Sequence, residues 1–212
     1  MSRGAPASIR VLLVERAAAM LARREPVTLR ALVEGTGAST MAVYTHFGSM
    51  SGLWRAVRQE GFTRLTARLA AVEQTTDPVR DLMALGAAYV GNALANPAFY
   101  RAMFDTAAEL EDPQAAAQTF QVLVSGAVRA QQAGRFADSC DPEAVATQFW
   151  ATGHGLMMLV LTGILPRSVL ETHVPNAAAA LFVAAGDHQD RCWRSVRAGW
   201  STMEAHPQQA SG

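Results

Sequence analysis

The sequence predicts an all-α protein of about nine helices, in which an N-terminal three-helix head precedes a larger helical bundle. Alanine is abundant and aromatic residues make up only 7% of the 212 residues, a composition that favours closely packed helices over sheets. Apolar residues recur at three- and four-residue spacing, and no segment shows the alternation that is typical of a strand. Half of the residues are hydrophobic, so the chain can bury a core in one or two domains.

Residues 8–47 predict the three helices of the head. Apolar residues at helical spacing indicate a first amphipathic helix over 8–22. Thr28 and Ser39 are good N-caps for two further helices, and Gly37 between them offers the left-handed residue that ends the first of the pair. Two caps with a glycine between them indicate a helix-turn-helix.

The helix that follows Ser39 is unusually polar for an element of a small core. It runs to about Phe47, and much of its surface can form hydrogen bonds, which suits a helix that lies in a DNA groove. Beside Met41 and Val43, its residues are Ser39, Thr40, Tyr44, Thr45 and His46.

The distribution of charge supports this interpretation, although the net charge is zero. Residues 1–68 hold ten arginines and four glutamates, whereas residues 69–212 hold eight arginines and fourteen acidic residues. A basic module on an acidic body is what a DNA-binding head requires. The alternative is a chance fluctuation between the two parts.

The remaining helices are predicted from their caps. Ser49 begins a long helix over 49–73 that links the head to the body. Four later helices begin where a capping side chain precedes a proline, at Asp77-Pro78, Asn96-Pro97, Asp112-Pro113 and Asp141-Pro142. These pairs predict helices over about 78–95, 97–109, 113–133 and 142–164. Pro175 is predicted to open a last helix that runs to about Trp200.

A set of residues in the head follows a known pattern. The set is Thr28-Leu29-Arg30, Gly37-Ala38-Ser39, Val43-Tyr44-Thr45-His46-Phe47 and Leu53. In these residues the head resembles that of the TetR (tetracycline-repressor) family of bacterial transcription regulators. The resemblance implies that residues 1–50 form a DNA-binding domain, whose helix after Ser39 enters the major groove, and that residues 51–212 bind a ligand and dimerise.

The same resemblance implies which side chains contact DNA. They are Thr28, Arg30, Ser39, Thr40, Met41, Tyr44, Thr45 and His46. By position, Tyr44 and His46 would mostly reach phosphates. Thr40, Met41 and Arg30 are the candidates for base edges.

The head departs from the family pattern near this helix. Met50 stands where the family usually has a lysine that holds a phosphate, and Ser51 stands where an acid usually follows. The helix dipole and the backbone N–H groups would then bind the phosphate alone, which predicts a weaker electrostatic contribution to binding. Val33 also replaces a small alanine.

Two segments of the body, 97–104 and 149–155, resemble a TetR subgroup with a Trp-His-Gly C-terminal domain. This resemblance implies a homodimer formed through the last two long helices and an enclosed inducer pocket. Methionine and aromatic side chains make an adaptable lining for a small hydrophobic ligand. The candidates are Met83, Phe99, Met103, Phe104, Phe120, Trp150, His154, Met157 and Met158. Ordinary core packing is the alternative for each, and His154 could instead form a hydrogen bond across helices.

The sequence predicts a regulator rather than an enzyme. It lacks Ser/His/Asp, HExxH, P-loop and GxGxxG patterns, it calls for no cofactor, and its histidines lack the spacing of metal ligands. The expected function is a repressor that a small hydrophobic ligand releases from a palindromic operator in double-stranded DNA. The alternatives are a regulator that activates or responds to a protein, and a helical enzyme in which the helix-turn-helix merely packs.

The sequence also predicts a cytoplasmic protein without a membrane partner. No uninterrupted apolar run of about eighteen residues indicates a membrane span, and the N-terminus lacks the pattern of a signal peptide. Cys140 and Cys192 predict reduced thiols rather than a disulfide framework. Cys140 lies at a predicted helix start, where the helix dipole could lower the pKa of a thiol, so a redox sensor is the alternative role.

Overall fold

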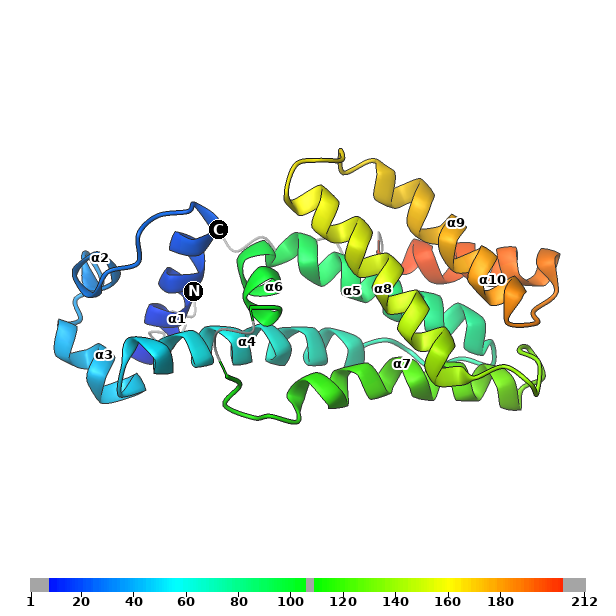
Figure 1. The fold of residues 1–212 in the computed structure, drawn as a ribbon, viewed down its shortest axis with the longest axis horizontal. Coiled ribbons are helices and arrows are strands. Elements are labelled where there is room, and N and C mark those ends of the chain that lie inside the picture. The colour runs from blue at the N-terminus through cyan, green and yellow to red at the C-terminus, as the bar shows by residue number, and fades with distance from the viewer. Residues whose placement is uncertain (1–7, 106–108, 204–212) are drawn as a thin grey trace, which may run out of the picture. The chain divides into compact units, whose positions relative to one another are not determined.

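The computed structural model describes residues 8–105 and 109–203, and the regular structure of these residues is entirely helical (Figure 1). This confirms the predicted all-α class, although the described residues form ten α-helices rather than about nine. A short 3-10 helix, η1 (Ser201–Met203), follows them. The helices are α1 (Ile9–Ala22), α2 (Leu29–Val33), α3 (Thr40–Phe47), α4 (Met50–Ala70), α5 (Pro78–Ala95), α6 (Pro97–Met103), α7 (Ala115–Gln132), α8 (Pro142–Leu161), α9 (Val169–Ala184) and α10 (Gln189–Trp200).

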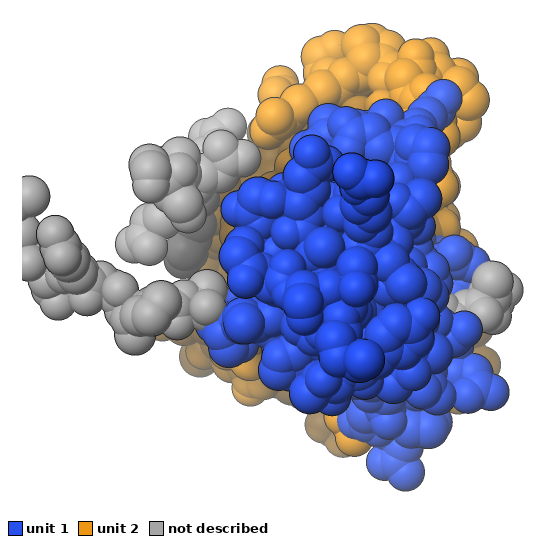
Figure 2. Space-filling view, turned by 90° about the vertical axis from the view of Figure 1, so that its left-hand side faces the viewer, with its two compact units in different colours: residues 1–64, 96–115 blue, residues 65–95, 116–212 orange. Residues whose placement is uncertain are grey.

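Packing divides the chain into two compact units (Figure 2). Unit 1 comprises residues 1–64 and 96–115, and unit 2 comprises residues 65–95 and 116–212. α4 therefore begins in unit 1 and ends in unit 2, and α6 belongs to unit 1 although it follows α5 of unit 2. A functional boundary after residue 50 stays a prediction, because compact packing does not define function.

The helices of the head begin at the residues that the sequence predicts. The Ser8 hydroxyl accepts a hydrogen bond from the Val11 N–H at 3.4 Å, and the Thr28 hydroxyl accepts one from the Ala31 N–H at 3.2 Å. α3 follows Ser39, as expected. Local caps thus set the starts of α1 and α2 without help from distant parts of the chain, whereas the Ser39 side chain makes no capping bond to α3.

The end of α2 differs from the prediction. α2 stops at Val33, and both Gly35 and Gly37 have a positive φ, of +70° and +74°. The Thr36 hydroxyl between them donates to the Val33 carbonyl oxygen at 2.7 Å and accepts from the Ala38 N–H at 3.1 Å. Gly37 therefore lies within the turn, which two glycines and one threonine build, and it does not end the helix.

The head core lies where α1, α2, α3 and α4 meet, and it extends to α6. Leu13 of α1, Leu32 of α2, Val43 of α3 and Leu53 of α4 are fully buried, and Phe99 of α6 packs in the same cluster. Burying a side chain of this size contributes about 1.5–3 kcal/mol. The core therefore fixes which face of α3 points inward.

Two arginines of α4 fix α6 at both of its ends. Arg64 donates from Nη1 to Asn96 Oδ1 at 2.9 Å, and Arg58 donates from Nε to the Met103 carbonyl oxygen at 2.9 Å. Gly61 lies between them and permits close approach, since a Cβ there would lie 2.5 Å from Met103 Cγ. Asn96 thus accepts from Arg64 and makes no capping bond to α6, contrary to the cap that the sequence predicts.

The segment between α6 and α7 contains less helix than predicted. The helix predicted over 97–109 ends at Met103, and residues 106–108 of that prediction lie outside the described residues. α7 begins at Ala115 instead of 113. Asp112 does accept a bond from the Gln114 N–H, at 2.9 Å, but it does so in a turn that precedes the helix.

The last predicted helix is in fact two. α9 ends at Ala184 and α10 begins at Gln189, and Pro175 lies inside α9 instead of opening a helix. A proline inside a helix leaves the carbonyl four residues earlier without its usual N–H partner. That carbonyl belongs to Glu171, an exposed residue of the first turn, where water can serve as the donor.

A buried ionic network joins three distant parts of unit 2. Arg135, which is 6% exposed, donates from Nε and Nη2 to the Asp187 carboxylate at 2.9 and 2.6 Å, and from Nη1 to Asp77 Oδ1 at 2.5 Å. The Ser195 hydroxyl accepts from Arg135 Nη2 at 2.9 Å and donates to Asp77 Oδ2 at 2.6 Å. The network connects the start of α5 and the α7–α8 loop with the α9–α10 loop and α10.

Acidification is expected to destabilise unit 2. Burial alone raises the pKa of Asp77, but hydrogen bonds from Ser195 and Arg135 outweigh it and hold this pKa below its ordinary value. Burial and the hydrogen bonds from Thr75 act in the same way on Asp81, whose pKa is also lowered. Both groups favour the folded state in their charged form, so their contribution is complete above about pH 5 and is lost as the pH falls through the lowered pKa values.

Thermal unfolding followed by circular dichroism between pH 6 and pH 3 tests this expectation. The midpoint should stay constant above about pH 5 and fall below about pH 4. The fall should be shallower in an Asp81→Asn variant, which has one such carboxylate fewer. A midpoint that rises on acidification would contradict the assignment of these charges.

Candidate nucleic-acid interface

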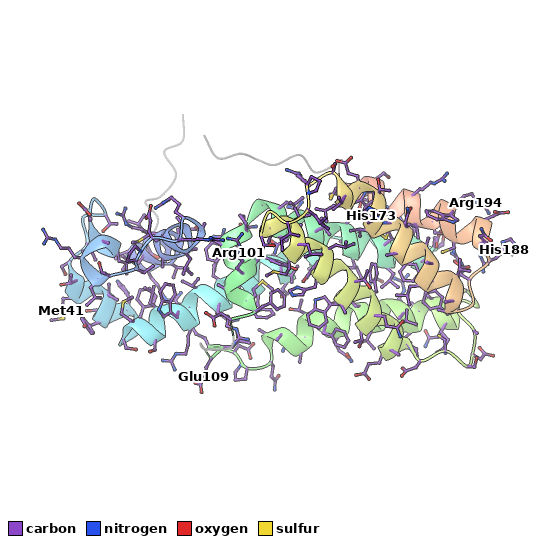
Figure 3. All side chains as sticks on the ribbon, turned by 45° about the horizontal axis from the view of Figure 1, so that its top comes forward. Met41, Arg101, Glu109, His173, His188 and Arg194 are labelled. Atoms are coloured by element: carbon purple, nitrogen blue, oxygen red, sulfur yellow. The ribbon has the colours of Figure 1, made fainter. Side chains whose placement is uncertain are left out.

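α3 is held in the head by two side chains and presents most of its other side chains to solvent. Val43 is fully buried and Phe47 is 8% exposed. Met41 is 67% exposed and points outward from α3 (Figure 3). The remaining predicted contacts here are also exposed, namely Ser39, Thr40, Tyr44, Thr45 and His46. The end of the head thus carries a polar helix surface with one apolar side chain.

The predicted contacts differ in the hydrogen bonds that they can still form. Thr45 Oγ1 already donates to the Met41 carbonyl oxygen at 3.0 Å, so Thr45 can only accept a further bond. The Thr28 hydroxyl accepts from the Ala31 N–H, so its proton is available to a phosphate oxygen. Ser39 makes no capping bond through its side chain, and its hydroxyl can donate or accept.

α2 contributes a hydroxyl and a cation. Thr28 and Arg30 are both exposed, at the beginning of a helix of five residues. Arg16 of α1 fixes this short helix from behind, because its Nε donates to the Ala31 carbonyl oxygen at 3.1 Å. Both side chains are therefore accessible to solvent, and their contact with DNA stays a prediction.

The N-terminus of α4 lacks the cation that the family pattern supplies. The Ser49 hydroxyl accepts from the Gly52 N–H at 3.0 Å. Met50 is partly buried and packs against the head core, where it presents no charge. A phosphate at this helix end would meet backbone N–H groups and the positive end of the helix dipole.

The structure adds one basic residue that sequence reasoning missed. The Arg10 guanidinium lies over the Phe47 ring, with Cζ 5.5 Å from the ring centroid. Its Nη2 donates to both carboxylate oxygens of Glu111, at 2.8 and 3.1 Å. A sequence signal was present, because the first turn of α1 holds an arginine and no acid although the helix dipole favours an acid there.

Some predicted ligand contacts form a hydrogen-bonded aromatic cluster in unit 2. Trp150 Nε1 donates to the Tyr89 hydroxyl at 3.2 Å, and this hydroxyl lies 3.2 Å from His154 Nδ1. The ring centroids of Phe120 and Trp150 are 6.0 Å apart. Burial lowers the pKa of His154, which favours a neutral imidazole whose Nδ1 can accept the Tyr89 proton.

The remaining ligand candidates are divided between the units. Met83 and Met157 of unit 2 are fully buried, and Met158 is partly buried. A Cβ on Gly199 of α10 would lie 2.8 Å from Met83 Cβ, so Met83 is packed closely beneath α10. Three candidates lie in unit 1: Phe99, Met103 and Phe104. Contact of these residues with a ligand stays a prediction.

Unit 2 also contains a groove of about 440 Å³ between the end of α4, α5 and α7. Apolar side chains such as Leu69, Leu82 and Val122 line it, together with the ion pair of Asp81 and Arg129, whose charged atoms are 3.2 Å apart. None of the predicted ligand contacts lines this groove. Sequence reasoning missed it because three helices share its lining and none of them shows it alone.

The thiols of both cysteines have a raised pKa. Burial raises the pKa of the Cys192 thiol to about 12. Burial, and then the charge of Asp141, also raise the pKa of Cys140, so the lowering considered from the helix start is wrong. No described histidines, cysteines and acids form a group of three or more that could hold a metal ion.

Comparison with known proteins links the chain to one family. Residues 82–185 match the family model of tetracyclin-repressor-like C-terminal domains. The search of curated proteins found no match. A solved structure of a protein of unknown function from Rhodococcus sp. RHA1 is 27% identical, with a TM-score of 0.69, and the match covers 92% of this chain and 98% of that one.

Two more distant structures share the fold. A TetR-family transcriptional regulator from Rhodococcus sp. is 22% identical, with a TM-score of 0.68, and the match covers 82% of this chain and 98% of that one. The TetR-family protein CprB from S. coelicolor A3(2) is 21% identical, with a TM-score of 0.61 and coverage of 95% and 98%. Membership of a Trp-His-Gly subgroup stays a prediction. The family match over residues 82–185 identifies a tetracyclin-repressor-like C-terminal domain in this chain, whose all-α fold is shared along most of its length with these solved structures.

Proposed function

We propose that the chain is a homodimeric repressor that binds a palindromic operator and leaves it when a small hydrophobic ligand binds. The observation that carries this proposal is the exposed surface of α3, where Met41 and five hydrogen-bonding residues face solvent while Val43 and Phe47 hold the helix in the core. A helix that is fixed on one side and polar on the other suits the major groove.

The exposed side chains divide by the part of DNA that they suit. Tyr44 and His46 can donate hydrogen bonds to phosphate oxygens and set the position of the head. Thr40, Met41 and Arg30 can reach base edges, where a hydroxyl, an apolar group and a guanidinium recognise different bases. Together they would give the head both a positioning and a reading function.

An uncovered apolar surface on α8 supports the homodimer. α8 is long and apolar enough to cross a membrane by length and composition alone, with a mean hydropathy of 1.2 over 18 residues, yet only 22% of that window is buried. Leu159 is 38% exposed, and a Cβ on Gly155 would meet no atom within 4 Å. A second copy of the same surface would cover it in a self-complementary contact.

The sequence predicts a dimer through the last two long helices, and we assign this contact to α8 and α9. The last predicted helix is two helices in the structure, and α10 buries its inner face in unit 2. Close packing of Gly199 against Met83 brings α10 onto α5. α9 is therefore the better partner for α8 in a dimer.

The cluster of Trp150, Tyr89 and His154 supports a small ligand with an apolar body and a polar group. The aromatic rings supply flat apolar contact. The hydroxyl, indole and imidazole groups, which hydrogen bonds link to one another, can reorient toward a ligand hydroxyl or carbonyl. A ligand that prefers one spacing of the two heads would shift the dimer away from the operator.

Removing single groups from α3 is expected to weaken DNA binding without unfolding the protein. Thr40→Ala or Tyr44→Phe should lower the affinity for duplex DNA from the chain's own promoter region by about tenfold or more, because one lost contact of this kind costs about 1–3 kcal/mol. Fluorescence anisotropy measures the affinity, and thermal unfolding should keep its midpoint. Thr63→Ala, at an exposed threonine of α4, is the matched control.

Two experiments test the proposal, the first for DNA binding and the second for a small ligand. Wild-type protein should bind the promoter duplex with an affinity that falls steeply with salt, and an absence of binding even at low salt would exclude a DNA-binding regulator. A thermal-shift screen with small hydrophobic molecules should find compounds that raise the unfolding midpoint and release DNA. Stabilising compounds that leave DNA bound would favour a regulator that responds to a protein instead.

A further inference from the structure

Arg10 occupies a position in the head that its own helix does not explain. It lies in the first turn of α1, where the helix dipole disfavours a cation. Its guanidinium lies over Phe47, the last residue of α3, and Gly48 and Ser49 lead directly from there into α4. Arg10 thus stands beside the junction of the two helices whose ends would meet the DNA backbone.

On the α4 side of this junction, the chain does not supply the cation of the family pattern. Met50 stands where the family pattern has a phosphate-binding lysine, and its side chain packs against the head core. The Arg10 side chain is 43% exposed and its guanidinium lies over the Phe47 ring, so its N–H groups can donate to an anion at this junction.

An anion already occupies this position in the structure. Glu111, 41% exposed, accepts from Arg10 Nη2 through both carboxylate oxygens. Glu111 lies in the segment that precedes α7, and this segment is anchored to α4 because the Asp112 N–H donates to Gln59 Oε1 at 2.9 Å. The carboxylate thereby holds the guanidinium in the way that a phosphate would.

We propose that Arg10 binds a DNA phosphate in place of the missing lysine, and that Glu111 is its intramolecular competitor. Arg10 exchanges the carboxylate for a phosphate when the dimer binds its operator. Because Glu111 lies close before the first residue of α7, the chain connects this competitor directly to unit 2. The inference rests on the proposed DNA-binding function.

Two substitutions that break the same ion pair have opposite expected effects on DNA binding. Arg10→Gln should weaken binding to the promoter duplex by about tenfold at low salt, and it should reduce the salt slope by about 1.8 for a dimer, since each phosphate contact contributes about 0.9. Glu111→Gln should strengthen binding by about two- to tenfold, because an exposed ion pair no longer has to open. Fluorescence anisotropy from 50 to 200 mM salt measures both.

Matched controls separate this inference from a structural role. Arg23 and Glu25 form another exposed ion pair, at 2.6 Å, near the opposite end of α1. Arg23→Gln and Glu25→Gln should change neither the affinity nor the salt slope to a similar extent. If Arg10→Gln and Glu111→Gln weaken binding alike, the pair only supports the fold, and the inference is wrong.

The same experiment distinguishes failure of the inference from failure of the proposed function. Wild-type protein that binds no duplex at low salt would overturn both. Wild-type protein that binds, with Thr40→Ala weakened and Arg10→Gln unchanged in affinity and salt slope, would overturn only the role of Arg10. Weaker binding by Arg10→Gln, tighter binding by Glu111→Gln and no gain from Glu111→Gln in the Arg10→Gln background would support it.

Discussion

Replacing Asp187 with alanine is expected to lower the free energy of unfolding by about 3–5 kcal/mol, because it leaves a buried charge without its main partner. The Asp187 side chain is fully buried and accepts two bonds from Arg135 and two from Arg191. After the substitution Arg135 would keep only Asp77 and the Ser195 hydroxyl. The start of α5 and the loop before α10 would then lose their common anchor.

Chemical denaturation followed by circular dichroism measures this loss. Asp190→Ala, three residues further along at an exposed position, is the control and should change stability by less than about 0.5 kcal/mol. An Arg135→Met, Asp187→Leu double variant should recover much of the lost stability, since it removes both charges together. A loss below about 1 kcal/mol in Asp187→Ala would mean that the network is not a main support of unit 2.

Replacing Gly155 with arginine is expected to separate the dimer and to weaken operator binding by about a hundredfold or more, because two linked heads gain about 10²–10⁴ in avidity. Gly155 is exposed on α8, and a Cβ there meets no atom of the same chain within 4 Å. The arginine would therefore fit the single chain while it blocks a close approach by a second copy.

Light scattering after size-exclusion chromatography measures the oligomeric state, and circular dichroism checks that the variant is folded. Ala133→Arg adds the same side chain at an exposed position at the end of α7 and should remain dimeric. Gly155→Ala is a smaller substitution that tests for close contact between two copies at this position. In an isolated chain it should stabilise α8 by about 0.8–1 kcal/mol, whereas in a tight dimer contact it should destabilise the assembly.

The elements that sequence predicted correctly are those determined by local chemistry. Ser8, Thr28 and Asp141 cap their helices through hydrogen bonds that span two or three residues. The polar surface of α3 and its buried Val43 follow from helical spacing alone. Such features need no knowledge of the rest of the fold.

Some features that sequence reasoning missed depend on contacts between distant residues, and others on local tolerance of an unusual residue. Asn96 was expected to cap α6, but Arg64 of α4 takes its carboxamide oxygen. The contact between Arg10 and Glu111 joins residues far apart in the chain, and no periodicity indicates it. Pro175 was expected to begin a helix, yet α9 accommodates it because an exposed first turn tolerates the lost bond.

The ligand candidates show a different limit of sequence reasoning. Methionine and aromatic residues fill cores as well as they line pockets, so composition does not separate the two roles. Phe99 packs in the head core and Met83 packs beneath α10, whereas Trp150 and His154 share a hydrogen-bonded cluster with Tyr89. Only the three-dimensional arrangement distinguishes these groups.

Selection of bound sequences from a random duplex pool tests most directly whether a dimer reads DNA through α3. Wild-type protein should enrich a palindrome whose half-sites lie about 34–36 Å, or one helical turn, or a multiple of it, apart. A Thr40→Ala variant should relax the base preference at symmetric positions of both half-sites. Enrichment of no sequence, or of a single half-site bound by one protomer, would contradict operator recognition by a symmetric pair of α3 helices.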